Sequence, residues 1–281
     1  MLRVATDSTC DLPPEYLRQQ DITIVPINIS FGAENYLDGV TIDRAELYQK
    51  IEQLGVLPRT SQPSVGQFQA VYDRLADEGA TEIISLHVGS KLSGTFQSAK
   101  LAKEMVAQRV AIYPFDSGCG SAGMGFMVLE ALRMAQAGKS VTDIMARLEV
   151  IRARINITLI VRDLRFAQMS GRVSKLQSNL ASLLHIKPMI VLRDGLLSVG
   201  GKARTESRGV DHMLQIMTER LGTTAPVNLA AVHAQAQDAG QALLDRAMTM
   251  FNCREGFVTE LAASLAVHFG PGTVGLVGYR L

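Results

Sequence analysis

Apolar residues follow two alternating spacings along the first half of the chain. Short runs of consecutive apolar residues predict buried strands, and apolar residues spaced by three and four predict helices that cover them. The predicted strands are Leu2–Ala5, Ile22–Ile29, Ile83–Val88 and Val110–Phe115. The predicted helices are Asp43–Leu54, Val65–Ala76, Thr95–Ala107 and Ser121–Gln136. This alternation favours a mostly parallel sheet with helices on both faces.

The second half has a less regular pattern, and a helix from Ser140 to about Arg154 precedes it. Its predicted strands are Ile157–Val161, Met189–Leu192, Leu196–Val199, Val227–Val232 and Gly256–Glu260. Its predicted helices are Glu206–Leu221 and Asp238–Met250. We therefore predict two domains, an N-terminal α/β domain at residues 1–155 and a C-terminal α+β domain with a mixed sheet at residues 156–281.

Composition excludes several classes of function. The 281 residues carry a formal net charge of +1, no Trp and no basic stripe with interleaved aromatics, so we expect no nucleic-acid binding. Three widely separated cysteines form no C-x-x-C pair, which predicts free thiols and no metal site. The first residues lack the apolar region of a signal peptide, and the longest uncharged stretch, Leu261–Tyr279, contains a proline and four glycines. We therefore expect a cytoplasmic protein without a transmembrane segment.

Loops rich in hydroxyl groups stand at the ends of predicted elements. These loops are TDST (Thr6–Thr9), RTSQPS (Arg59–Ser64), KLSGT (Lys91–Thr95) and FDSG (Phe115–Gly118). Ser, Thr and Asp in such places can cap helices. Alternatively, some of the hydroxyls donate to a bound carboxylate or phosphate together with the free N–H groups of a helix N-terminus. We expect the loops to converge at one sheet edge, which favours this second interpretation.

The segment GCGSAG (Gly118–Gly123) fits the G-x-G-x-x-G pattern of dinucleotide-binding loops. Asp143 follows at about the usual distance, but in the first turn of a predicted helix instead of at the end of a strand. We therefore prefer close helix–strand packing, and keep as the alternative an enzyme or sensor that binds a nucleotide or another small anion there. The following helix is apolar nearly all round, which is typical of a buried helix or of one that lines an apolar cavity. Its Met124, Phe126 and Met127 suit a flexible hydrophobic ligand.

His268 is the histidine that the pattern singles out, because the turn Gly270-Pro271-Gly272 follows it and would hold its ring in place. A fixed imidazole can pair with a buried anion. Ser93 is a candidate nucleophile with His268 as its base, but the chain has no G-x-S-x-G, P-loop or H-E-x-x-H motif. We therefore predict no catalytic residue.

Eight stretches appear in one order over nearly the whole chain. They are TDSTCDLP (6–13), YLDGV (36–40), TSQPS (60–64), SKLSGTFQSA (90–99), FDSGCGSAGMG (115–125), GRVSK (171–175), IKP (186–188) and HFGPGTVG (268–275). Taken together, they resemble the DegV family of bacterial fatty-acid-binding proteins. The sequence departs from the family pattern at Ser170, where a glycine is frequent, and at Thr205, where a glycine often follows the Lys202-Ala203-Arg204 triplet.

This resemblance implies the two-domain DegV-like (EDD) fold, with one long-chain fatty acid such as palmitate, stearate or oleate in a tunnel between the domains. It implies that the residues that hold the carboxylate are Thr60, Ser61, Ser93, Gly94 and His268. Met124, Phe126 and Met127 are expected along the acyl chain.

The resemblance also implies a carrier without a cofactor that is not itself an enzyme. The expected partner is a separate fatty acid kinase with a dihydroxyacetone-kinase-like nucleotide domain, which receives the fatty acid. The acyl phosphate then serves phospholipid synthesis, with transient membrane contact at most. We expect Arg172, Lys202 and Arg204 to dock the kinase.

Overall fold

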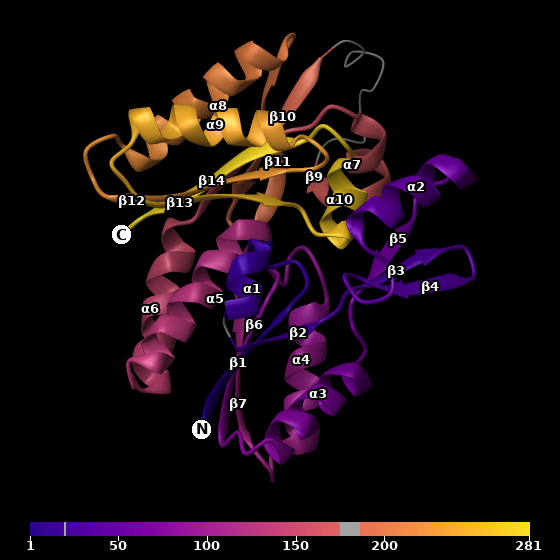
Figure 1. Ribbon diagram of the computed structural model, residues 1–281, viewed down its shortest axis with the longest axis vertical. Helices are drawn as coiled ribbons and strands as arrows, with labels where there is room; N and C mark the ends of the chain where they lie inside the picture. Colours follow the sequence, from indigo (N-terminus) through magenta and orange to yellow (C-terminus); the bar gives the residue numbers. More distant parts are fainter. Residues whose placement is uncertain (20, 175–185) are drawn as a thin grey trace. The chain divides into compact units, whose positions relative to one another are not determined.

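The computed structural model describes residues 1–19, 21–174 and 186–281, which form two compact units (Figure 1). The first unit comprises Met1–Arg152 together with Ala262–Ser264. The second unit comprises Ala153–Leu261 and Leu265–Leu281. The predicted boundary after residue 155 lies close to the observed division at Arg152, but the short segment that returns to the first unit was not predicted.

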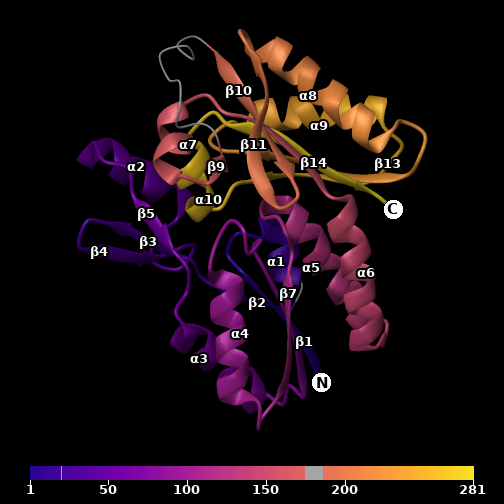
Figure 2. The same ribbon diagram turned by 180° about the vertical axis from the view of Figure 1, so that it is seen from behind.

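A four-stranded parallel sheet in the order β2-β1-β6-β7 forms the centre of the first unit. Helices α3 and α4 lie together along one of its faces, and α5 lies along the other (Figures 1 and 2). Alternate side chains of the strands meet the helices on each face, so both faces are buried. The strands are β1 (Leu2–Asp7), β2 (Ile22–Val25), β6 (Glu82–His87) and β7 (Ala111–Asp116). The helices are α1 (Pro14–Gln19), α2 (Arg44–Leu54), α3 (Val65–Asp77), α4 (Thr95–Val106), α5 (Ser121–Gln136) and α6 (Val141–Arg154).

A small antiparallel sheet in the order β4-β3-β5 completes the first unit. The prediction of one strand over Ile22–Ile29 was wrong, because the chain leaves the parallel sheet at Pro26 and enters the small sheet at Asn28. Proline has no N–H group to donate to a neighbouring strand, which favours a break at this point. The strands of the small sheet are β3 (Asn28–Phe31), β4 (Glu34–Leu37) and β5 (Arg59–Ser61).

The second unit contains a seven-stranded mixed sheet in the order β13-β12-β14-β8-β10-β11-β9. Helices α8 and α9 pack side by side on this sheet and bury Met213, Met217 and Leu243 against it (Figures 1 and 2). Its strands are β8 (Asn156–Ile160), β9 (Val173–Ser174), β10 (Lys187–Arg193), β11 (Leu196–Ala203), β12 (Val227–His233), β13 (Cys253–Glu260) and β14 (Val274–Arg280). The remaining helices are α7 (Leu164–Ser170), α8 (Glu206–Leu221), α9 (Gln237–Met250) and α10 (Ala263–Phe269).

Strand β14 is central in this sheet, although the sequence analysis assigned no strand to it. It pairs antiparallel with β12 on one side and with β8 on the other. Its two glycines obscure the strand pattern, but both are needed where they stand. A Cβ on Gly275 would lie 2.9 Å from the carbonyl oxygen of Thr158, and one on Gly278 would lie 3.0 Å from that of Asn228.

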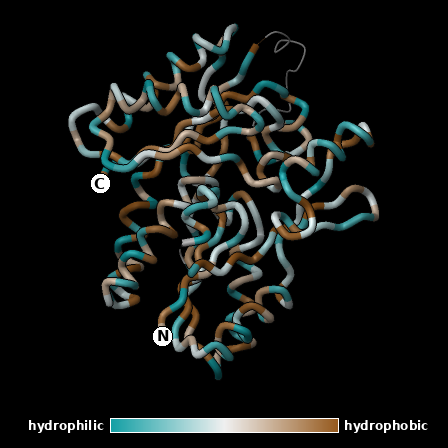
Figure 3. The backbone as a smooth tube through the Cα atoms, in the orientation of Figure 1, coloured by the Kyte–Doolittle hydropathy of each residue, from teal (hydrophilic) through white to brown (hydrophobic). Residues whose placement is uncertain are grey.

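Hydrophobic residues concentrate in the strands of both units, which are largely brown in Figure 3. The strand β12, for example, is buried at all of its positions. None of the helices in the described ranges is both long and apolar enough to cross a membrane.

Candidate functional site

The loop after β6 leads directly into the N-terminus of α4. Gly94 caps this helix without a side-chain hydrogen bond, and Ser93 and Gly94 are both half-buried. The hydroxyls of Ser93 and Thr95 lie 2.9 Å apart. Because the first N–H groups of a helix have no partner within the helix and carry the positive end of its dipole, they favour a bound anion. The loop therefore offers hydroxyl donors beside a helix N-terminus.

The TSQPS segment approaches the same loop through the side chain of Gln62. A Cβ on Gly94 would lie 2.6 Å from Cδ of Gln62, so the glutamine side chain rests against the glycine. Thr60 and Ser61 precede Gln62 in β5, where Thr60 is half-buried and Ser61 is exposed. Gln62, which directly follows β5, thus brings the end of that strand next to the Ser93 loop, while Thr60 and Ser61 themselves lie within β5.

Ser64 caps a helix, which is the first of the two roles predicted for the hydroxyl loops. Its hydroxyl accepts a hydrogen bond from the N–H of Gln67 at 3.1 Å, and the Gln67 side chain accepts one from the Ser64 N–H at 2.8 Å. This capping box starts α3. The expectation that four hydroxyl loops share one sheet edge was wrong for TSQPS, which leaves the small sheet. The other three loops leave β1, β6 and β7 at the carboxyl ends of the parallel sheet.

The glycines of GCGSAG allow the close approach of two backbone segments. The N–H of Gly89 donates to the carbonyl oxygen of Cys119 at 2.7 Å, and a Cβ on Gly89 would lie 2.8 Å from the carbonyl carbon of Gly118. One carboxylate oxygen of Asp116 accepts from Ser90 N–H at 3.0 Å and from Gly118 N–H at 2.9 Å. The glycine-rich loop therefore packs against the start of the Ser93 loop. This packing accounts for the glycine pattern of GCGSAG without a bound nucleotide.

A buried polar chain holds the end of β6 in place. Asp7, which is fully buried, accepts from the N–H of Val88 at 2.9 Å and lies 3.2 Å from Nδ1 of His87. The other ring nitrogen of His87 lies 2.7 Å from the hydroxyl of Ser85, which in turn lies 2.9 Å from that of Tyr72. His87 therefore has a structural role. Because every member has a partner, the chain fixes the point from which the Ser93 loop departs.

Helix α5 is buried along most of its length, as its all-round hydrophobic pattern predicts. Met124 and Met127 have no exposed surface, and Phe126 is 2% exposed. These side chains form part of the apolar interior of the first unit.

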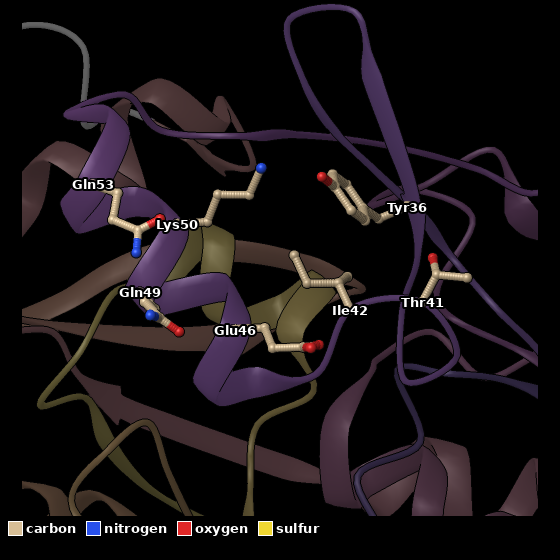
Figure 4. A pocket seen from close by; sticks show the side chains of 7 residues that line it. All are labelled: Tyr36, Thr41, Ile42, Glu46, Gln49, Lys50 and Gln53. Atoms are coloured by element: carbon tan, nitrogen blue, oxygen red, sulfur yellow. The ribbon is translucent and has the colours of Figure 1, made fainter.

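The first unit has a recess of about 240 Å³ between α2 and the small sheet (Figure 4). Polar side chains of α2 line one wall, and Tyr36 and Thr41 line the other. The amine of Lys50 lies 5.2 Å from the centre of the Tyr36 ring and forms an ion pair with Glu34 at 2.7 Å. Such a wall does not suit an acyl chain.

His268 lies in the last turn of α10, and a constrained turn follows it. Gly270 and Gly272 adopt left-handed backbone conformations with φ of 75° and 78°, and Gly272 N–H donates to the carbonyl oxygen of Ala234 at 2.7 Å. Burial, followed by the positive charge of Arg172, lowers the pKa of His268 to about 3. The imidazole is therefore neutral at physiological pH and can donate a hydrogen bond without carrying a charge.

The predicted docking residues lie in two places in the second unit. Arg172 is close enough to His268 for its positive charge to lower the pKa of the imidazole. The Arg172 guanidinium donates to the carbonyl oxygen of Ser170 at 2.6 Å. Lys202 and Arg204 are exposed at the end of β11 and just after it. Lys175, the last residue of the GRVSK stretch, lies outside the described residues.

Comparisons with known proteins agree with this architecture. A family model described as "Uncharacterised protein, DegV family COG1307" matches residues 1–280. The chain belongs to the DegV family. A DegV domain-containing protein of Halalkalibacterium halodurans is 31% identical to it, over 99% of this chain and 98% of the relative.

Solved DegV structures share the fold over the full chain. A DegV family protein from Thermus thermophilus, whose structure is described in terms of fatty acid binding, matches with a TM-score of 0.91 and 33% identity over 100% of this chain and 99% of that one. A stearic-acid-binding protein from Eubacterium ventriosum matches with a TM-score of 0.91 and 27% identity, over 100% of this chain and 98% of that one. The match confirms the predicted two-domain fold.

Both departures from the DegV pattern have local structural explanations. The hydroxyl of Ser170 donates to the carbonyl oxygen of Ala167 at 2.9 Å, and Gly171, with φ of 64°, ends α7. Thr205 caps α8 by accepting from the N–H of Arg208 at 3.3 Å. Neither substitution disturbs the element beside it.

Two buried carboxylates of this DegV chain, which the sequence analysis missed, hold the returning segment 262–264. Asp11 accepts from Ala262 N–H at 2.7 Å and from the Ser121 hydroxyl at 2.6 Å. Asp38 accepts from the Ser264 N–H at 3.3 Å and from the Ser264 hydroxyl. Asp11 and Ala262 are 251 positions apart in the chain, so no local pattern could reveal the pair.

The stability of this DegV chain is expected to depend on pH through Asp11. Burial raises the pKa of Asp11 to about 7, against the hydrogen bond donated by Ser121 and the charge of Arg44, which lower it. The native state thus binds a proton that the unfolded chain releases, and the contribution of Asp11 to the free energy of unfolding falls as the pH rises from about 4 to about 7. Asp11→Asn retains an acceptor for Ala262 and a polar partner for Ser121, and should remove this dependence.

Denaturant unfolding of both proteins across this pH range measures the effect. The difference in free energy of unfolding, variant minus wild type, should grow with pH up to about 7 and then level off. The depressed pKa of His268 makes stability fall towards acid pH in both proteins, so that contribution cancels in the difference. A difference that is independent of pH would contradict the prediction.

Proposed function

We propose that this protein binds one long-chain fatty acid and carries it without chemically changing it. The observation that carries the proposal is the N-terminus of α4, where the N-cap residue Gly94 has no side chain and the hydroxyls of Ser93 and Thr95 lie side by side. The Ser93 hydroxyl accepts from the Thr95 N–H at 3.4 Å and can donate its own proton to a bound anion. The fatty-acid binding described for its relatives from Thermus thermophilus and Eubacterium ventriosum supports this assignment.

The energetics of a fatty acid explain why such a head-group site is needed. Burial stabilises an acyl chain by about 0.8 kcal/mol per methylene, so a sixteen-carbon chain gains on the order of 10 kcal/mol before other costs. The same burial removes a carboxylate from water, which costs several kcal/mol unless hydrogen bonds replace the lost hydration. Hydroxyl donors, the N-terminus of α4 and a neutral imidazole offset this cost.

In the proposed complex, the carboxylate is held by Thr60, Ser61, Ser93 and Gly94 of the first unit and by His268 of the second. The acyl chain lies along α5, where Met124, Phe126 and Met127 provide an apolar and adaptable surface. Because the assigned side-chain donors are uncharged at physiological pH, the same site suits a carboxylate or an acyl phosphate.

The proposed partner is a separate fatty acid kinase with a dihydroxyacetone-kinase-like nucleotide domain, to which the protein presents the fatty acid in the cytoplasm. Arg172, Lys202 and Arg204 are the proposed docking residues, and the acyl phosphate would then enter phospholipid metabolism. The absence of a P-loop motif from the sequence supports a division of labour with a nucleotide-binding enzyme.

Denaturing extraction of freshly purified protein, followed by mass spectrometry of lipids, tests the ligand class. One fatty acid per chain is the expected result, and its mass identifies the chain length. Protein that is free of lipid and does not bind added palmitate or oleate would contradict the proposal. Binding of a nucleotide by that protein would favour the alternative at GCGSAG.

Ser93→Ala is expected to weaken fatty-acid binding by about 10- to 100-fold, because a hydrogen bond to a charged group contributes about 1.5–3 kcal/mol. Displacement of a fluorescent fatty acid measures the affinity. Ser90→Ala is the matched control, since Ser90 is exposed in the same loop and uses its N–H in the contact with Asp116. Equal affinity of both variants and the wild type would exclude Ser93 from the head-group site.

A further inference from the structure

A recess in the second unit gathers arginine side chains from three different parts of the chain. It has a volume of about 480 Å³, and Arg154, Arg220 and Arg280 line it. Arg154 ends α6, Arg220 lies in the last turn of α8, and Arg280 ends β14. Asn156 contributes an amide, and Leu221 and Ala225 contribute apolar surface.

Main-chain oxygens hold two of these guanidinium groups in place. Arg280 donates from Nε to the carbonyl oxygen of Leu221 at 2.7 Å and from a terminal nitrogen to that of Arg220 at 3.0 Å. It therefore caps the C-terminus of α8. Arg154 donates to the main-chain oxygen of Leu281 at 3.0 Å. Within the described part of the chain, no Asp or Glu side chain forms an ion pair with Arg154, Arg220 or Arg280.

Positive charge gathers at this recess and close to it. Burial lowers the pKa of the Arg220 guanidinium, and repulsion by Arg193 lowers it further. Glu219 opposes this effect only in part, and its carboxylate also accepts a hydrogen bond from Gln215 at 3.1 Å. Arg154 and Arg280 are exposed and Arg220 is half-buried, so an anion that enters the recess can contact guanidinium groups that no carboxylate side chain of the described residues neutralises.

We propose that this arginine recess binds a phosphate group, at a site separate from the proposed fatty-acid site. Guanidinium groups present paired N–H donors that match the oxygens of a phosphate, and they retain their charge while main-chain oxygens hold them in position. The recess has room for more than a phosphate ion. Its volume of about 480 Å³ corresponds to many water molecules, each of which takes up about 30 Å³ in the liquid. The apolar surface of Leu221 and Ala225 leaves room for an organic substituent, so the ligand class is a phosphate monoester.

Thermal unfolding of the full chain at constant ionic strength tests this proposal. Inorganic phosphate and phenyl phosphate should each raise the melting temperature in a saturable manner, whereas the same ionic strength of chloride should not. Arg220→Gln should weaken the apparent affinity for phosphate at least tenfold. Arg208→Gln, which removes the same charge from an exposed position on the same helix, should leave that affinity unchanged.

A second measurement separates a binding role from a structural one. Without added anion, Arg220→Gln should melt no lower than Arg208→Gln, because it removes a charge that Arg193 repels. If Arg220→Gln does melt lower, Arg154→Gln provides the same test of phosphate affinity. Vesicles with phosphatidic acid identify the source of the phosphate: binding to them alone, lost in Arg220→Gln, assigns the site to a lipid head group. Equal phosphate stabilisation of wild type and both recess variants would overturn the proposal.

Discussion

Gly94→Val is expected to weaken fatty-acid binding by at least about 100-fold, which corresponds to about 2.7 kcal/mol. The new side chain would occupy the space where Gln62 rests against Gly94. It would push Gln62 away and place methyl groups beside the hydroxyl of Ser93, at the N-terminus of α4. A carboxylate could then no longer approach the helix. Its burial would be costly, because no hydrogen-bond donors would replace the lost water.

The fold should survive this substitution. Gly94 has φ of −76°, which any residue adopts, and the displaced group is the end of a flexible side chain. Gly66→Val is the control, since Gly66 is exposed on α3 and the nearest atom to its Cβ position is 3.9 Å away. Fatty-acid affinity and circular dichroism of both variants check the prediction. Full affinity in a folded Gly94→Val protein would place the head group elsewhere.

Gly125→Ala is expected to lower the free energy of unfolding by about 1–3 kcal/mol, although alanine is the better helix former. A Cβ at this buried position of α5 would lie 2.6 Å from the carbonyl oxygen of Cys10 and 2.9 Å from Cδ2 of Leu12. The nearest neighbour is backbone, so either the helix or the loop after β1 must move.

The same substitution at Gly66 should have the opposite sign. Gly66→Ala fills open space on α3 and should raise the free energy of unfolding by up to about 1 kcal/mol. Denaturant unfolding followed by circular dichroism compares the two variants with the wild type. If Gly125→Ala is as stable as Gly66→Ala, the close contact between α5 and the Cys10 loop does not restrict side-chain size at position 125, and the prediction is wrong.

Local patterns predicted the helices and strands closely wherever caps or strong periodicity mark them. The predicted helix Ser121–Gln136 coincides with α5, and Glu206–Leu221 coincides with α8. Strand β14 and helix α10 were missed, because glycines interrupt the strand pattern and α10 has only seven residues. A short helix depends on tertiary packing more than on its own sequence.

For the candidate site, the sequence indicated the kind of group and its approximate place. The hydroxyls of the Ser93 loop and the constrained turn after His268 were both recognisable from residue type alone. The roles of Gln62 and Asp11 were not, because each depends on a partner that is distant along the chain. A polar residue in a loop has many potential partners, and its sequence neighbours do not select among them.

By itself, the sequence determined the alternation that places helices on a parallel sheet, and the capping boxes with which Asp43 starts α2 and Ser64 starts α3. These features depend on residues within about one helical turn of each other, so short windows of sequence contain them. Only the tertiary structure decided that the backbone of GCGSAG packs closely against Gly89, that Asp11 accepts a hydrogen bond from Ala262, and that three arginines share one recess. Such contacts depend on the path of the chain through space, which the packing of the two cores sets.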